Sequence, residues 1–214
     1  MSNDVYFFDC DKTLYSYDFR QRLPRLAELT GASQYHLAKT WWEGGHEAAA
    51  EAGEYATTEE YLAAFAFVTG FALTREQWVE ARAAAMSPIA GALEALRWAA
   101  DRGTVSLLSN NPVIFRDSFA ELAPDAAALL GGNDLVSAVL GARKPERRIY
   151  TRALGRFGVE GQNAIFIDDS AANLVGAAST GMHTFQLLPA PLPGQPDRFN
   201  TLELMDALRA FATR

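Results

Sequence analysis

Three short apolar runs, each followed directly by acidic or polar residues, most constrain how this chain can fold. Short runs of this kind, with helical patterns between them, are typical of strands buried in a parallel sheet. The carboxyl ends of such strands meet at one edge of the sheet, where ligands bind. The runs are residues 5–8 before Asp9-Cys10-Asp11, residues 105–108 before Ser109-Asn110-Asn111, and residues 164–167 before Asp168-Asp169.

The remaining pattern predicts an α/β fold whose core is a Rossmann-like, doubly wound parallel sheet. Weaker strands are expected at residues 135–139 and 184–188, and helices at residues 89–102, 145–157 and 171–180. The proline-rich segment from Pro189 through Pro191 and Pro193 to Pro196 predicts an extended loop before a final helix over residues 201–211.

The interval between the first two strong strands is too long for one crossover and predicts an inserted all-helical unit. Helices are expected at residues 18–30, 33–43, 57–68 and 74–86, and Thr57 with Glu60 and Thr74 with Gln77 have capping-box spacing. We therefore expect a core domain made of residues 1–14 and 87–214 and a cap domain made of residues 15–86. An insertion at this point would stand over the acidic pair and could close the site to water.

Composition excludes several classes of partner. With 214 residues and 49% hydrophobic content, the chain can form one core domain and a smaller companion. Nineteen basic against 26 acidic residues, with no basic cluster, argue against binding nucleic acid or an anionic membrane. The one cysteine cannot form an internal disulfide, and no signal peptide or membrane-length apolar stretch is apparent. We expect a cytoplasmic protein, whose oligomeric state the sequence does not indicate.

Asp9 and Asp11 are the first candidates for chemistry. Alternate residues of a strand share a face, so both carboxylates would start on the same side. One could act as a nucleophile and the other as a general acid and base, and two adjacent anions invite a divalent cation. An acidic pair at a solvated strand end is the alternative interpretation.

The later strand ends add further candidates, each ambiguous by itself. Ser109 and Asn110 could hold phosphate oxygens, or they could belong to an ordinary turn. Lys144, ahead of Pro145 at a helix start, could present a fixed positive charge or remain solvated. Asp168 and Asp169 again place hard oxygen ligands at a strand end, as Mg²⁺ prefers.

In this order the series Asp-x-Asp-x-Thr, Ser, Lys-Pro and Asp-Asp resembles the four motifs of the haloacid dehalogenase-like hydrolase superfamily, over residues 5–188. The position of the insertion resembles the helical cap of subfamily I. The segments around the motifs look most like phosphatases of the glucose-1-phosphate phosphatase or nucleotidase type. The resemblance implies these roles: Asp9 as nucleophile, Asp11 as acid and base, Lys144 as catalytic cation, Thr13, Ser109, Asn110 and Lys144 as substrate contacts, and Asp9, the Asp11 carbonyl, Asp169 and Asp168 as Mg²⁺ ligands.

The function expected from this resemblance is magnesium-dependent hydrolysis of a small phosphomonoester, a sugar phosphate or a nucleotide, through an aspartyl-phosphate intermediate. A phosphomutase similar to beta-phosphoglucomutase, a 2-haloacid dehalogenase, and a metabolite-binding regulatory protein on the same fold remain alternatives. Phosphonatase chemistry would need a cap lysine, for which Lys39 is the candidate. Lys12 departs from the family pattern, which more often has glycine or asparagine at that position.

Three further features are compatible with either a structural or a functional role. Trp41 and Trp42 are adjacent on an expected helix, so one is expected to pack inside the cap while the other faces the cleft or solvent. His46 and Glu47 follow two glycines and are expected in a surface loop. Cys10 should point away from the acids as a small buried hydrophobe.

Overall fold

A five-stranded parallel sheet lies at the centre of the computed structural model, which describes residues 4–191 and 199–214. The strand order is β5-β4-β1-β6-β7, so the chain winds outward in both directions from β1. This confirms the expected doubly wound sheet, and it places the crevice of such folds at the carboxyl end of β1. The strands are β1 (Val5–Phe8), β4 (Thr104–Ser109), β5 (Asp134–Val136), β6 (Ala164–Asp168) and β7 (His183–Gln186).

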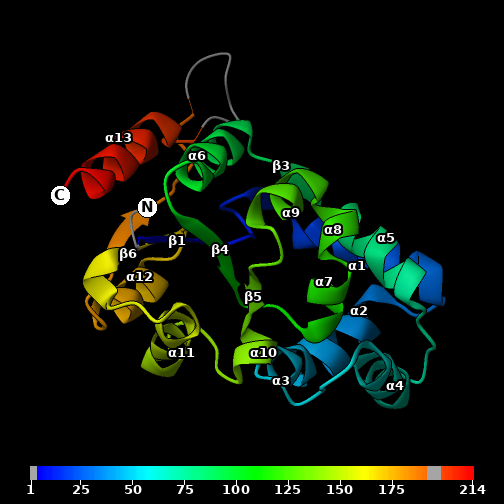
Figure 1. The fold of residues 1–214 in the computed structure, drawn as a ribbon. Helices are drawn as coiled ribbons and strands as arrows, with labels where there is room; N and C mark the ends of the chain where they lie inside the picture. Colours follow the sequence, from blue (N-terminus) through cyan, green and yellow to red (C-terminus); the bar gives the residue numbers. More distant parts are fainter. Residues whose placement is uncertain (1–3, 192–198) are drawn as a thin grey trace.

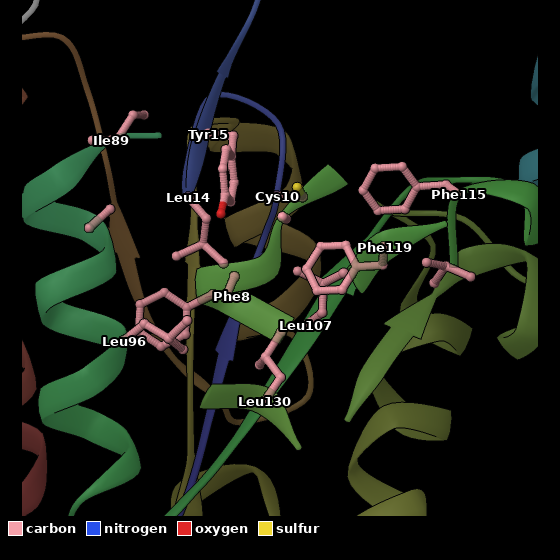
Figure 2. Close-up of a cluster of buried hydrophobic side chains, with 14 of the residues drawn as sticks. Phe8, Cys10, Leu14, Tyr15, Ile89, Leu96, Leu107, Phe115, Phe119 and Leu130 are labelled. Carbon is pink, nitrogen blue, oxygen red and sulfur yellow. The ribbon is translucent and has the colours of Figure 1, made fainter. Parts of the chain in front are cut away.

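Helices cover both faces of the sheet (Figure 1). Tyr6 and Phe8 of β1 belong to one apolar cluster, which also contains side chains of α6 (Ala90–Ala100) and α13 (Thr201–Ala212). Val5 and Phe7 belong to the other cluster, with α11 (Arg147–Phe157) and α12 (Ala171–Ala178). Alternate residues of β1 are thus buried on opposite faces, which explains its continuous apolar sequence. Figure 2 shows the first cluster, where Phe8 lies near Leu96 and Leu107.

The inserted helical segment, here called the cap, is joined to the core by a two-stranded antiparallel ribbon. β2 (Tyr15–Tyr17) pairs with β3 (Met86–Pro88) in this ribbon. Thr74 and Gln77 form the predicted capping box, with both reciprocal hydrogen bonds present. The helices between the two strands are α1 (Phe19–Thr30), α2 (Gln34–Leu37), the π-helical turn η1 (Ala38–Trp42), α3 (His46–Glu51), α4 (Thr58–Thr69) and α5 (Arg75–Ala83).

Several of the expected elements end earlier than predicted, two of them by three residues. The helix expected to reach Met86 ends at Ala83, because the next residues pair in the ribbon. The strand expected over residues 135–139 ends at Val136, and α10 (Ser137–Leu140) follows it. The remaining core helices are too short for a helical period to be read from sequence: α7 (Val113–Asp117), α8 (Phe119–Leu122), α9 (Pro124–Leu130) and the 3₁₀ turn η2 (Gly161–Asn163).

The expected surface loop at His46 and Glu47 is wrong. Gly45 takes a φ of 84° and its carbonyl accepts from the N–H of Ala49, so the glycine pair begins α3 instead of a loop. Glu47 is buried inside the cap. Pro193 and Pro196 of the expected proline-rich loop lie outside the described residues. Among the described helices, none has the length and apolar character to cross a membrane.

Candidate active site

Three neighbouring strands bring polar side chains to one edge of the sheet. Asp9 follows β1, Ser109 ends β4, and Asp168 ends β6. The N–H of Asp9 still donates to the carbonyl of Ile167 at 2.9 Å, so the sheet fixes the position of Asp9. The structure therefore brings the residues at these three strand ends together.

Lys144 links two of these strand ends from the loop before α11. Its side chain is buried, and its Nζ atom lies 2.9 Å from Asp9 Oδ1 and donates to Asp168 Oδ2 at 2.6 Å. Burial lowers the pKa of Lys144, but the two carboxylates outweigh burial and raise the pKa above its ordinary value. The ammonium therefore stays charged where it can hold both a carboxylate and a phosphoryl oxygen.

The cluster around Lys144 carries more negative than positive charge. Asp9, Asp168 and Asp169 each present a carboxylate oxygen within 4.8 Å of the others. Burial and the Asp9 carboxylate raise the pKa of Asp168 to about 6, against the opposing effect of Lys144, and the same two causes raise the pKa of Asp169. Burial is the largest cause of both shifts, and the nearby Asp9 carboxylate adds to it because a like charge raises a carboxyl pKa. Hard oxygen donors with surplus negative charge fit a Mg²⁺ ion.

The three carboxylates differ in burial and in the hydrogen bonds that they already accept. Asp168 is fully buried and accepts from the N–H of Ser170 at 2.8 Å and from Asn173 Nδ2 at 3.0 and 3.1 Å. Asp9 and Asp169 instead line the open cleft above the sheet edge. Asp9 and Asp169 are therefore better placed to bind a Mg²⁺ ion directly. Asp168, already hydrogen-bonded, is better placed to contact the ion through a water molecule.

Asn110 clamps the loop that carries Lys144. Its Nδ2 atom donates to the carbonyl of Lys144 at 3.0 Å, and its Oδ1 atom accepts from the N–H of Lys144 at 2.8 Å. Asn110 and Ser109 line the cleft, and Ser109 accepts from Asn111 Nδ2 at 3.0 Å. Thr13 is fully buried and is not among the residues that line the cleft, and its Oγ1 atom has no hydrogen-bond partner in the described part of the chain. The substrate contact predicted for Thr13 stays a prediction.

The side chain of Asp11 is held by the cap. Arg82, in the last turn of α5, donates from Nη2 to Asp11 Oδ1 at 2.5 Å. The buried guanidinium packs against the rings of Tyr17 and Phe115, 4.3 and 4.9 Å from their centroids. Burial lowers the pKa of Arg82, but Asp11, Tyr17 and Cys10 together outweigh burial and raise the pKa above its ordinary value. The metal contact predicted for the main-chain carbonyl of Asp11 stays a prediction.

The cleft at this edge has a volume of about 250 Å³ and is lined by both the core and the cap. The cap contributes Tyr17 and Glu51. Arg143, beside Lys144 in the core, donates from Nε to Glu51 Oε2 at 2.8 Å and so ties the two parts together. Burial and then the Glu47 carboxylate raise the pKa of Glu51 to about 7, although Arg143 lowers it.

Two residues of the first motif have special backbone or packing roles. Lys12 is the one described non-glycine residue with a left-handed φ, 62°, a conformation that favours glycine or asparagine. Its side chain is exposed at the cleft. Cys10 is buried in the apolar cluster, as predicted, and burial raises the pKa of its thiol well above its ordinary value.

Sequence reasoning missed Arg82, Glu51 and Arg143, and it missed that Asn110 clamps a loop. Each of these groups acts through a partner far away in the chain. Nothing in a helical pattern separates Arg82 from the other arginines, and Glu51 ends a helix that the sequence did not predict. Only the adjacency of Arg143 to the Lys-Pro pair could have drawn attention to it.

The chain matches the family model described as haloacid dehalogenase-like hydrolase over residues 4–181. Three solved structures are similar at 18% sequence identity, a level that shows the fold alone. A predicted HAD-like hydrolase from Porphyromonas gingivalis has a TM-score of 0.73, with 96% of this chain and 97% of that chain covered. A HAD family enzyme from Bacteroides thetaiotaomicron, in complex with magnesium and inorganic phosphate, has a TM-score of 0.69 and coverage of 88% and 96%. A 2-haloacid dehalogenase from Pseudomonas syringae pv. tomato has a TM-score of 0.66 and coverage of 99% and 100%.

The doubly wound sheet has an acidic cluster at its carboxyl edge, and the inserted helical segment lines the cleft beside it, so the fold is an α/β fold with a site between core and insertion. The family model covers most of the chain, and its match agrees with this fold. The protein belongs to the haloacid dehalogenase-like hydrolase family.

Proposed function

We propose that this protein is a magnesium-dependent phosphatase that hydrolyses a small phosphomonoester through an aspartyl-phosphate at Asp9. The observation that carries the proposal is the buried Lys144 ammonium, 2.9 Å from Asp9 Oδ1 within a group of three carboxylates. A phosphomonoester and a nucleophilic carboxylate repel one another, so the reaction needs cations fixed beside the attacking oxygen. Lys144 supplies one such charge, and Asp9, Asp168 and Asp169 would hold the Mg²⁺ ion.

The proposed chemistry has two steps, each a displacement at phosphorus. When bound, Mg²⁺ would neutralise charge on the phosphoryl oxygens. An oxygen of Asp9 attacks phosphorus, the ester P–O bond breaks, and Asp11 gives a proton to the departing alkoxide. Asp11 then takes a proton from water as the water oxygen attacks the phosphorus of phospho-Asp9. Inorganic phosphate leaves, and the Asp9 carboxylate is restored.

The lining of the cleft favours a sugar phosphate over a nucleotide. The Glu51–Arg143 pair offers both an acceptor and donors to hydroxyl groups beside the phosphate position. Tyr17 is the single aromatic ring among the described lining residues, so the cleft has little surface on which a base could stack. A volume of about 250 Å³ also suits a small leaving group.

The central test is the Asp9→Asn variant, assayed with p-nitrophenyl phosphate and magnesium. We expect turnover to be abolished, because the amide cannot form the phosphoryl intermediate. Asp101→Asn, at an exposed turn, is the matched control and should keep wild-type activity. Full activity in Asp9→Asn would exclude the covalent mechanism. A panel of sugar phosphates, nucleoside monophosphates and phosphoglycolate would then identify the substrate class.

The other activities have distinct readouts. Halide release from a 2-haloacid in the presence of EDTA would indicate a dehalogenase, which the acid at Asp11 and the metal-site carboxylates disfavour. An isomerised sugar phosphate in place of free phosphate would indicate a phosphomutase. Tight binding of a metabolite without turnover would indicate a regulatory protein. Lys39, the candidate lysine for phosphonatase chemistry, is exposed and pairs with Glu43 at 2.6 Å.

A further inference from the structure

The two acids of the first motif are held by different parts of the molecule. Asp9 Oδ1 accepts from the N–H of Cys10 at 2.7 Å and contacts Lys144 at 2.9 Å, so the core alone fixes the nucleophile. The side chain of Asp11 has one hydrogen-bond partner among the described residues, Arg82 of the cap. The position of Asp11 therefore depends on a residue 71 positions further along the chain.

The surroundings of Arg82 fix the direction of its guanidinium. Its side chain is 1% exposed, and the rings of Tyr17 and Phe115 pack against it. Tyr17 in turn accepts a hydrogen bond from Arg22 Nη1 at 3.2 Å, so the ring between the two arginines is itself held in place. A planar guanidinium packed in this way presents its donors in one fixed orientation.

Packing alone does not account for an arginine at this position. A buried guanidinium is costly unless it is paired, and the Nε atom of Arg82 has no partner in the described part of the chain. The charge is compensated through the bond from Nη2 to Asp11, whose side chain is 26% exposed at the cleft. An apolar side chain would fill the space beside the two rings, but it would leave Asp11 unrestrained.

We propose that Arg82 is the positioning residue for Asp11, so that the cap, through Arg82, places the group that transfers the proton. The inference rests on the proposed phosphatase function. Asp11 acts on the leaving group, and its contribution therefore depends on how much the departing oxygen needs a proton. A phenolate needs the proton, whereas the much more stable p-nitrophenolate leaves with little help.

The test compares phenyl phosphate with p-nitrophenyl phosphate, two substrates of similar shape, by kcat/KM with saturating magnesium. This parameter reports the steps up to phosphorylation of Asp9, whichever later step limits kcat. We expect Arg82→Met to lower kcat/KM for phenyl phosphate about 10- to 100-fold more than for p-nitrophenyl phosphate. Arg82→Lys keeps the charge without the planar fork and should show a smaller selective loss.

A double-mutant cycle separates positioning from folding. Asp11→Asn alone should produce the same selective loss, and adding Arg82→Met to Asp11→Asn should produce no further selectivity between the two substrates. A general disturbance of the fold would lower kcat/KM for both substrates by the same factor. If Arg82→Met fails to fold, Arg82→Lys, with a native circular dichroism spectrum, carries the comparison in both backgrounds.

The outcomes are distinguishable from failure of the proposed function. If the wild-type protein hydrolyses neither ester with magnesium, the phosphatase proposal fails and this inference fails with it. If the wild type hydrolyses both esters but the Arg82 variants lower kcat/KM for both by the same factor, only the positioning role is overturned. The same holds if Arg82→Met changes the selectivity between the two esters further in the Asp11→Asn background.

Discussion

The molecule contains two buried clusters of charged side chains, one at the sheet edge and one inside the cap. In the cap, Glu47 Oε2 accepts from Trp41 Nε1 at 2.6 Å and from the Tyr61 hydroxyl at 2.7 Å, while Glu47 Oε1 lies 3.5 Å from Arg22. One positive charge meets one negative charge there. In the core cluster three carboxylates lie together, the Lys144 ammonium contacts Asp9 and Asp168, and Asp9 and Asp169 line the cleft.

The difference shows that burial of charge does not by itself mark a functional site. The cap cluster is balanced and its Glu47 is fully hydrogen-bonded, so its role is to fix the packing of the cap. The core cluster has surplus negative charge and raised carboxyl pKa values, as expected of a site that a cation and a substrate would complete. Four predictions test this contrast.

Removal of the ammonium from the core cluster should have the largest effect. Lys144→Met preserves most of the side-chain length but leaves three carboxylates without their fixed cation. We expect kcat/KM for p-nitrophenyl phosphate to fall about 1,000-fold, because the charge beside the attacking oxygen is lost. Lys39→Met, at an exposed position, is the control. Near-normal activity of Lys144→Met would show that the Lys144 charge beside the carboxylates has no role in catalysis.

In the cap cluster, the corresponding change should affect stability instead of activity. Glu47→Ala leaves Arg22 buried without its partner and should lower the free energy of unfolding by about 3–5 kcal/mol in urea titrations. The folded fraction should keep its kcat/KM. Glu43→Ala, which removes an exposed pair with Lys39, should cost less than about 0.5 kcal/mol. A lowered kcat/KM in folded Glu47→Ala would show that the cap cluster also contributes to catalysis.

Glu51 joins the two parts of the molecule and should make stability depend on pH. Its pKa in the folded protein, about 7, lies above the ordinary value of 4.5, so its contribution is present below pH 4.5 and is lost as pH rises through 7. Glu51→Gln mimics the neutral form. The variant should nearly match wild type near pH 4.5 and exceed it by about 3 kcal/mol at pH 8.

Urea titrations of Glu51→Gln and of the control Glu54→Gln, at an exposed position, at both pH values measure this difference. Glu54→Gln should follow the wild type throughout. If Glu51→Gln were less stable than the wild type at pH 8, the ion pair with Arg143 would outweigh the burial of Glu51.

Magnesium should give the smallest effect, as a stabilisation confined to the core cluster. At ten times its dissociation constant, Mg²⁺ should stabilise the protein by about 1.4 kcal/mol and raise Tm by about 4 °C relative to EDTA. Asp169→Asn removes one carboxylate of the cluster and should reduce the shift, whereas Asp101→Asn should keep it. An undiminished shift in Asp169→Asn would place the cation elsewhere.

The parts of the fold predicted from sequence are those encoded by local pattern. The runs before Asp9, Ser109 and Asp168 are apolar because their strands are covered on both faces, and each strand is found within one residue of its expected start. The helix α3 was missed because a left-handed Gly45 can begin a helix as well as a loop. The short helices α7 to α9 were missed because they are too brief to show a period.

The candidate site also has a part that the sequence predicts and a part that it does not. The order of acids, serine and lysine along the chain was enough to bring Asp9, Lys144 and Asp168 into one predicted group, since parallel strand ends must share an edge. The role of Asn110 was not predictable, because its hydrogen bonds to the Lys144 peptide depend on how two loops meet.

The sequence by itself determined the α/β core, the inserted cap and the chemical groups at the carboxyl edge of the sheet, because strand periodicity and the position of polar residues are local properties. The tertiary structure decided which of those groups are paired. It set Arg82 on Asp11 and Glu51 on Arg143, pairs separated by 71 and 92 positions in the chain. Such pairs form only when the cap packs on the core, and charge compensation between distant segments leaves no periodic trace in the sequence.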